Sequence, residues 1–178
     1  MCRNRLKTII YLLLLLVIVP RMGMAIEVHT RYATIIYNED SDLDRFNEEI
    51  YLGKYNFLLQ QDGIQDVTDE VRLKTDLIVD RVKEILDMFP ENIRFKIAIC
   101  ASNQDIGKIH KLIYGEPADI SAFYAPDIDI VFFSAEDAEL ATIAHEFAHV
   151  IMHKYFQMSP PVKIHELLSR YVATHIKD

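Results

Sequence analysis

Hydrophobic and polar positions along the chain follow two periods, which predicts strands interleaved with helices. Segments rich in β-branched and aromatic residues with a period of two predict strands, whereas apolar residues three or four positions apart predict helices. Strands are expected over residues 28–37, 95–99, 121–124 and 128–133. Helices are expected over residues 41–52, 68–88, 103–114 and 135–155, with a last helix that ends near His175. The sequence contains no internal repeat and no linker, so this order predicts a single domain of the α+β class.

Capping and turn residues indicate where these elements should begin and end. Ser41 is placed to cap the first expected helix and Thr68 to open the next, which Pro90 should end. Gly115 should end the helix of residues 103–114. Residues 125–127, Ala-Pro-Asp, predict a turn between the last two strands.

The first 25 residues have the layout of a secretory signal peptide. Basic residues at positions 3, 5 and 7 precede an apolar run over residues 9–19, and the small residues Gly23 and Ala25 follow at the −3 and −1 positions of a cleavage site. A membrane anchor is the alternative, but a spanning helix needs about 20 apolar residues, and Arg21 interrupts the run too early. We therefore expect export with cleavage after Ala25, a mature domain of residues 26–178, and membrane association only where the leader stays uncleaved.

The net charge narrows the classes of partner. The whole chain has a formal charge of −8, and the leader contains four basic residues and no acidic one, so residues 26–178 carry −12. So negative a charge argues against a nucleic-acid partner, which needs a basic face, and the chain taken as a whole is repelled by anionic lipid. One cysteine remains after cleavage, Cys100, in the apolar run of residues 97–100, where a buried and unreactive thiol is expected.

The chemistry of the chain is concentrated in His145-Glu146-Phe147-Ala148-His149, an HExxH motif. Two histidines four positions apart lie on one side of a helix, offset by about 40° and one turn, so both imidazoles can reach one zinc ion. Glu146 lies on the same side, where its carboxylate can take a proton from a zinc-bound water. The alternative is a helix with two surface histidines. It is disfavoured because apolar residues cover nearly all of this helix, and buried polar groups need partners.

A hydrolytic zinc site needs a third protein ligand and leaves its fourth position open. Metzincins place a third histidine six residues after the second, and this chain has Tyr155 there. The other option is an acidic residue on the next helix. Glu166 follows His149 by 17 positions, with the midpoint in the expected turn, so an antiparallel helix pair would bring these two residues level. His165 is the alternative third ligand, although it projects about 100° around the helix from Glu166.

These features resemble those of the gluzincin metallopeptidases, in particular their minimal peptidase-MA-like domains. The resemblance rests on residues 121–133, on the HExxH helix and on Glu166 with Tyr171 five positions later, and it extends more loosely back to residue 68. It implies a zincin-like fold, in which a small mixed sheet packs against the HExxH helix, a following antiparallel helix supplies the third ligand, and the edge strand borders the substrate cleft.

The resemblance also implies a role for each site residue. His145, His149 and Glu166 would bind Zn²⁺, and Glu146 would be the catalytic general base. Gluzincins often have an acidic residue four positions after the third ligand, and this chain has Arg170 there. That departure leaves the partners that orient the ligand histidines unassigned.

Two further residues are weaker candidates. Tyr124, at the end of the expected edge strand, could donate to a developing oxyanion, with simple packing as the alternative. His153 is expected at the rim of the site. The sequence is thus interpreted as an exported zinc metallopeptidase that hydrolyses peptide or protein substrates, with no nucleic-acid partner. The alternative is a non-catalytic, zinc-stabilised extracytoplasmic binding module on the same fold.

Overall fold

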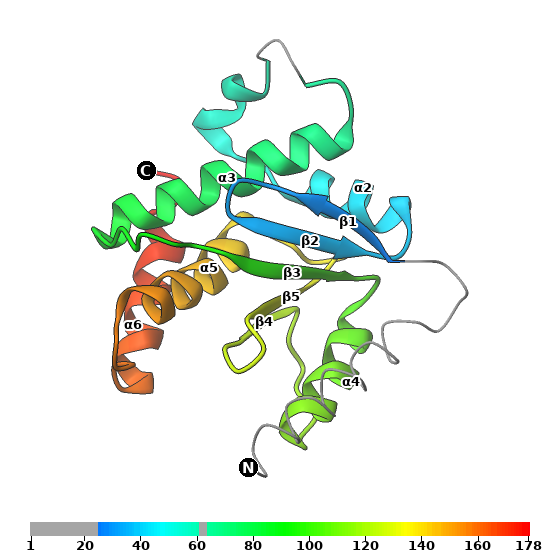
Figure 1. The fold of residues 1–178 in the computed structure, drawn as a ribbon. Coiled ribbons are helices and arrows are strands. Elements are labelled where there is room, and N and C mark those ends of the chain that lie inside the picture. The colour runs from blue at the N-terminus through cyan, green and yellow to red at the C-terminus, as the bar shows by residue number, and fades with distance from the viewer. Residues whose placement is uncertain (1–24, 61–63) are drawn as a thin grey trace.

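The computed structural model describes residues 25–60 and 64–178, which form a five-stranded mixed sheet with helices on both of its faces (Figure 1). The strands are β1 (Ile26–His29), β2 (Ala33–Tyr37), β3 (Phe95–Cys100), β4 (Ala122–Ala125) and β5 (Ile130–Ser134). The helices are α2 (Asp40–Glu49), the 3₁₀ helix η1 (Gly53–Gln60), α3 (Val67–Leu86), α4 (Asn103–Tyr114), α5 (Leu140–Tyr155) and α6 (Val162–His175). The expected α+β class is confirmed.

The sheet has parallel strands in its middle and antiparallel strands at both edges, in the order β1-β2-β3-β5-β4. β2, β3 and β5 run parallel because connections that contain helices join them. β1 directly precedes β2, and β4 directly precedes β5. Each pair is joined by a short turn and is therefore antiparallel. β4 is consequently an edge strand, and it lies next to α5.

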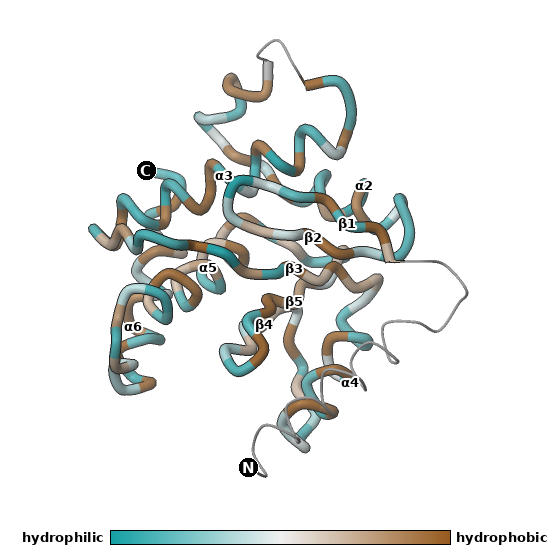
Figure 2. The backbone as a smooth tube through the Cα atoms, viewed as in Figure 1, coloured by the Kyte–Doolittle hydropathy of each residue, from teal (hydrophilic) through white to brown (hydrophobic). Residues whose placement is uncertain are grey.

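Alternating side chains of the central strands fill two hydrophobic cores. Ile97 and Val131 belong to the larger core, together with buried side chains of α2, α3, α5 and α6. Ala98 and Phe132 point to the opposite face and form a smaller core with α4. This period of two is expected for strands that are buried on both faces. Figure 2 shows the corresponding hydrophobic stretches along the strands and intermittently along the helices.

Residues 28–37, expected as one strand, form the hairpin of β1 and β2 instead. The Thr30 hydroxyl closes the turn, because it accepts hydrogen bonds from the backbone N–H of Tyr32 (3.1 Å) and of Ala33 (2.8 Å). A side chain that bonds to the backbone in this way replaces the ladder of a strand. The turn contains no Gly, Pro or Asn, so its composition did not reveal it.

Several helix starts also differ from the expectation. Ser41 lies inside α2 rather than at its start. Asp66, not Thr68, caps α3, because its carboxylate accepts the backbone N–H of Asp69 at 2.9 Å. α5 begins later than expected, since residues 135–139 form turn and loop before it.

Two helices end in a residue with left-handed backbone conformation. Gly115 (φ 86°) follows α4, whose bounds match the expectation, because glycine adopts this conformation without steric cost. Asp87 (φ 52°) ends α3 in the same way, before Pro90 is reached. The 3₁₀ helix η1 had no periodic pattern that predicted it.

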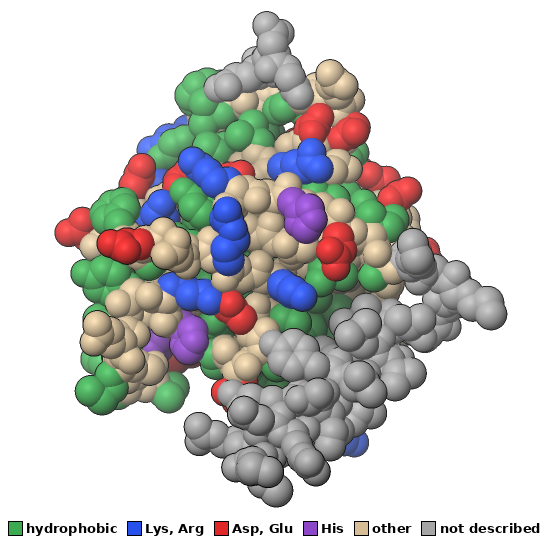
Figure 3. All heavy atoms as spheres, viewed as in Figure 1, with side chains coloured by type: hydrophobic (Ala, Val, Ile, Leu, Met, Phe, Trp, Pro, Cys, Tyr) green, Lys and Arg blue, Asp and Glu red, His purple; other side chains and the backbone are tan. Residues whose placement is uncertain are grey.

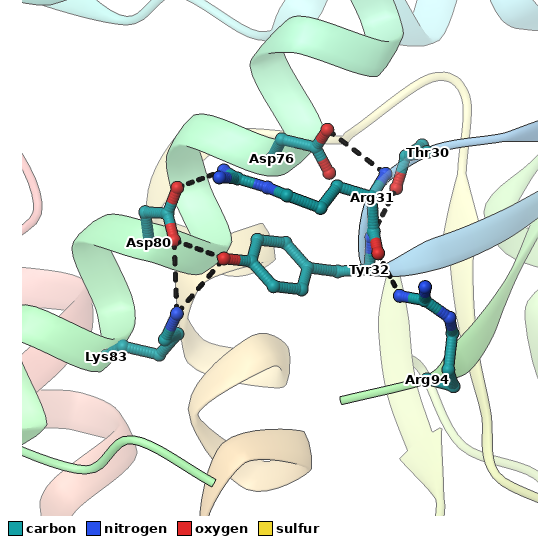
Figure 4. A network of polar contacts seen from close by, with 7 residues as sticks. All are labelled: Thr30, Arg31, Tyr32, Asp76, Asp80, Lys83 and Arg94. Atoms are coloured by element: carbon teal, nitrogen blue, oxygen red, sulfur yellow. Dashed lines mark hydrogen bonds and ion pairs between the residues drawn. The ribbon is translucent and has the colours of Figure 1, made fainter. Parts of the chain in front are cut away.

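A polar network fastens the β1–β2 turn to α3 (Figure 4). The Tyr32 hydroxyl donates to the Asp80 carboxylate at 2.6 Å and accepts from the Lys83 ammonium at 3.0 Å. Arg31 forms an ion pair with the same carboxylate, and Arg94 donates to the Arg31 carbonyl. Burial alone would raise the pKa of Asp80, but the hydrogen bonds from Tyr32 and Lys83 hold it below its ordinary value. The hairpin is thereby fixed to the helix that covers the sheet.

The expected leader falls on residues that lie outside the described ones, apart from Ala25. Within the described ranges, no helix combines the length and the apolar character needed to cross a bilayer. Cys100 packs partly buried against the smaller core, and burial raises the pKa of its thiol to about 12. This agrees with the expectation of an unreactive thiol.

Candidate metal centre

α5 carries the HExxH motif between the sheet and α6 (Figure 1). Its buried side chains are Leu140, Ile143, Ala144, Phe147, Ala148, Val150, Ile151 and Met152. The expected buried helix is therefore confirmed. The side chains of His145 and His149 keep 23% and 16% of their surface exposed, so they form an accessible polar stripe on an otherwise buried helix.

α6 returns along α5 after the loop of residues 156–161. Ser169 on α6 is fully buried, as are Ala144 and Ala148 on α5, so small side chains allow the two helices to pack closely. This packing places Glu166 beside His149, with 3.4 Å between Glu166 Oε1 and His149 Nε2. The expected level placement of these two residues is found in the structure.

Three side chains from the two helices converge on one point. His145 Nε2 lies 3.2 Å from His149 Nε2 and 3.7 Å from Glu166 Oε2. Metal–ligand bonds of about 2.05 Å at tetrahedral angles separate neighbouring ligand atoms by about 3.3 Å. The distances from His149 Nε2 to His145 Nε2 (3.2 Å) and to Glu166 Oε1 (3.4 Å) are close to that value, and the other Glu166 oxygen lies 3.7 Å from His145 Nε2, so the group is close enough to hold a metal ion. Three protein ligands would leave a fourth tetrahedral position for water or substrate.

Both imidazoles are held in the neutral form that binds metals. Burial, together with the neighbouring His145 and His165, lowers the pKa of His149 to about 4. Burial also lowers the pKa of His145, although the Glu166 carboxylate acts in the opposite direction. A neutral imidazole offers a lone pair on Nε2, so at neutral pH the two histidines lose no proton when a metal binds.

Glu146 lines the same pocket as the three possible ligands. The pKa of Glu146 is raised to about 7, chiefly by burial and to a smaller extent by the charge of Glu166. A hydrogen bond from the backbone of Tyr124 acts in the opposite direction. Because β4 is an edge strand, it can direct a backbone N–H at the carboxylate instead of at another strand. A carboxylate with a pKa near 7 is suited to proton transfer at neutral pH.

A pocket of about 330 Å³ opens over these residues. It is lined by Phe123, Tyr124, Pro126, His145, Glu146, His149, His153, Ser159, Pro160, Val162, His165 and Glu166. Figure 3 shows histidine side chains at the lower left, over α5 and α6. Another cavity, of about 140 Å³, lies between η1, α3 and Ile176 and contains none of the histidines, so the metal-binding chemistry belongs to the larger pocket.

His165, the alternative third ligand, lies in this pocket but has other contacts. Its ring stacks on that of His149, with 5.7 Å between centroids and 15° between planes. Its Nε2 lies 2.9 Å from the hydroxyl of Ser159, in the loop before α6. Among the described residues, Glu166 rather than His165 completes the group of close ligand atoms.

The hydroxyl of Tyr124 does not reach the metal-binding group. It donates to the Asp129 carboxylate at 2.9 Å, and burial together with that carboxylate raises the pKa of Tyr124. Lys154 forms an ion pair with Asp129 from the end of α5. The structure therefore gives no support to Tyr124 as an oxyanion donor. His153 is exposed and packs edge-on against Tyr124 (5.9 Å between centroids), at the rim where it was expected.

Sequence reasoning missed two parts of this site. The loop that contains Ser159 and Pro160 forms a wall of the pocket. The pair of Asp129 and Lys154 ties the β4–β5 turn to α5, and Asp129 has a positive φ of 58°. An aspartate tolerates that conformation better than most residues, which marks the turn, but a partner 25 positions away leaves no local signal.

Comparisons with family models, with curated proteins and with solved structures find no match for this chain. The function therefore has to be inferred from the residues of the site and their geometry. The group of His145, His149 and Glu166 is compatible with a zincin-like motif.

Proposed function

We propose that this protein is an exported, zinc-dependent peptidase of the gluzincin type, which hydrolyses peptide bonds in peptide or protein substrates. The observation that carries the proposal is the convergence of His145, His149 and Glu166, with contacts of 3.2, 3.4 and 3.7 Å between their donor atoms, in the pocket that Glu146 also lines. Two imidazoles and one carboxylate with an open fourth position are a ligand set of hydrolytic zinc sites. Zinc held there would supply the Lewis acidity that acidifies water and polarises a carbonyl oxygen.

Glu146 has the role of proton carrier in this proposal. Its carboxylate takes a proton from the attacking water and then delivers it to the leaving amine. The carboxylate lines the same pocket as the three possible ligands, which supports both steps. The Tyr124 backbone holds the carboxylate in place between the ligand histidines and the edge strand.

The shape of the pocket supports a polypeptide substrate. Edge strand β4 forms one wall, and an extended peptide can lie along such an edge. Phe123, Pro126 and Val162 give the pocket apolar contacts beside the polar group. The leader pattern of residues 1–25 supports export.

A non-catalytic zinc-stabilised binding module is the second candidate function. The observation that favours it is the Tyr124 hydroxyl, which is bound to Asp129 and not directed at a reacting carbonyl. A zinc site on this fold would then stabilise the packing of α5 against α6 without hydrolysing a ligand.

Replacing Glu146 with glutamine tests the proposal. Glu146→Gln should bind zinc as the wild type does and should cleave a peptide library at least 10²–10⁴-fold more slowly, because the general base is lost. Glu139→Gln is the matched control, since it makes the same change at an exposed position just before α5. Wild-type rates in Glu146→Gln would contradict the mechanism. A zinc-loaded wild type that cleaves nothing would favour the binding module.

A further inference from the structure

An exposed apolar surface lies on the side of α6 that faces away from α5. We call this surface the α6 face; its residues, with their exposed fractions, are Ile164 (42%), Leu167 (63%) and Tyr171 (50%) on the helix and Met158 (85%) in the loop before it. The side chains of Ile164, Leu167 and Tyr171 recur three and four positions apart, so they form one stripe along the helix. Figure 3 shows hydrophobic side chains at the lower left, over the α5–α6 loop and the start of α6.

Basic residues run beside this stripe. Lys163 and Arg170 are exposed and seven positions apart, so they lie on one side of α6. Lys177, also exposed, follows the end of the helix. The segment of residues 154–178 contains four basic and two acidic residues, a net charge of +2. Residues 26–153 contain 11 basic and 25 acidic residues, a net charge of −14. The charge of the chain is therefore strongly uneven. Three of the four basic residues of this segment lie on or just after α6, and the fourth, Lys154, is paired with Asp129 at the end of α5.

We propose that the α6 face binds the surface of a bilayer that contains anionic lipid. A helix with an apolar stripe flanked by Lys and Arg lies in a membrane interface with its apolar side chains among the acyl chains and its cations at the headgroups. The acidic remainder of the chain does not prevent this. Charges further from the membrane than about 8 Å are largely screened at physiological salt. In the orientation with α6 against the lipid, the acidic elements beyond that distance therefore repel the membrane only weakly.

The same charges disfavour a second copy of this chain as the occupant of the α6 face. A symmetric pair of α6 helices would place Lys163, Arg170 and Lys177 opposite the same residues of the other copy. Anionic headgroups provide the opposite charge along the whole stripe. Apolar burial would be similar in both cases, so the charges decide between them.

Binding in this orientation would bring the metal-binding pocket close to the membrane. Met158, which is part of the α6 face, directly precedes Ser159 and Pro160 in the loop before α6. Ser159 and Pro160 line the pocket, so this loop joins the two surfaces. Polypeptide segments at the lipid surface would then be the accessible substrates. This inference goes beyond the proposed function and stands or falls independently of hydrolysis.

Vesicle flotation tests the inference directly. The protein is residues 26–178 with Glu146→Gln, without added zinc, so neither hydrolysis nor the leader contributes. It should float with vesicles of phosphatidylcholine and phosphatidylglycerol, should bind pure phosphatidylcholine vesicles far more weakly, and should dissociate as salt is raised. Lys163→Glu with Lys177→Glu should weaken the partition coefficient at least about 25-fold, from about fivefold for each cation removed. Leu167→Ala with Tyr171→Ala should weaken it about tenfold or more.

Matched controls on other elements separate the α6 face from general effects. Lys108→Glu with Lys111→Glu makes the same charge change on α4, and Tyr51→Ala with Leu112→Ala removes the same kinds of exposed side chain. Both controls should float like the parent protein, and circular dichroism should show the same helix content in every variant. Equal losses in the controls, or no flotation of the parent, would overturn the inference. A dimer that depends on Leu167 and Tyr171, without flotation, would assign the α6 face to self-association instead.

Discussion

Replacing Glu166 with alanine should weaken zinc binding at least about a hundredfold, whereas replacing His165 should change it less than about tenfold. The Glu166 oxygens lie 3.4 and 3.7 Å from Nε2 of His149 and His145, so the change deletes one of three protein donors. Loss of a residue that only orients a ligand lowers metal affinity by about 10–100-fold, and loss of a ligand itself costs more. His165 stacks on the ring of His149 and does not complete the group of close ligand atoms.

The same difference can be measured as thermal stability. At a free zinc concentration 100 times the wild-type Kd, zinc stabilises the folded protein by about 2.7 kcal/mol. With a Kd raised a hundredfold, that stabilisation falls to about 0.4 kcal/mol. A domain of this size changes its Tm by about 2–4 °C per kcal/mol, so the zinc-dependent rise in Tm should shrink by about 5–9 °C in Glu166→Ala.

The assay compares wild type, Glu166→Ala and His165→Ala in buffered zinc and in chelator, with zinc content measured on the purified proteins. In chelator the three Tm values should agree within a few degrees, because both side chains are partly exposed. Loss of the zinc effect in His165→Ala with its retention in Glu166→Ala would refute this reasoning and assign the third ligand to His165. Retention in both variants would refute a site of three protein ligands.

Two predictions concern stability away from the metal. Asp80→Asn should destabilise the protein by about 1 kcal/mol at pH 7, a value discounted for partial exposure. The folded-state pKa of Asp80 is lowered, so its contribution to stability is fully present above the unfolded-state pKa of about 3.9 and is lost as pH falls through the folded-state pKa. Urea unfolding of wild type and Asp80→Asn should therefore show that their difference in free energy of unfolding disappears in that pH range. A difference that persists at the lowest pH would contradict the charge argument. Within the described part of the chain, the buried Ser169 hydroxyl has no hydrogen-bond partner, so Ser169→Ala should raise the free energy of unfolding by about 1 kcal/mol. Ser169→Leu should lower it, because the larger side chain overpacks the contact between α5 and α6. A loss of stability in Ser169→Ala would reveal a partner for the hydroxyl.

The sequence by itself determined those features that depend on neighbours a few positions away. α4 was predicted with its bounds, and Gly115 marked its end because it acts within one helix; the structure adds a cap by Ser102 at its start. The buried character of α5 and the placement of both histidines on one side follow from helical periodicity. The level placement of Glu166 with His149 followed from the length of the connection, since a short loop between antiparallel helices fixes their register.

Only the tertiary structure decided the features that join distant parts of the chain. The Thr30 turn split an expected strand, because a side chain competed successfully for backbone hydrogen bonds that composition assigned to a ladder. Tyr124 was directed to Asp129, and the pKa of Glu146 was set by burial and by the backbone of β4. The exposed stripe of α6 appeared only once the opposite side of that helix was buried against α5. Contacts and pKa shifts of this kind depend on the packing of whole elements, so no local pattern encodes them.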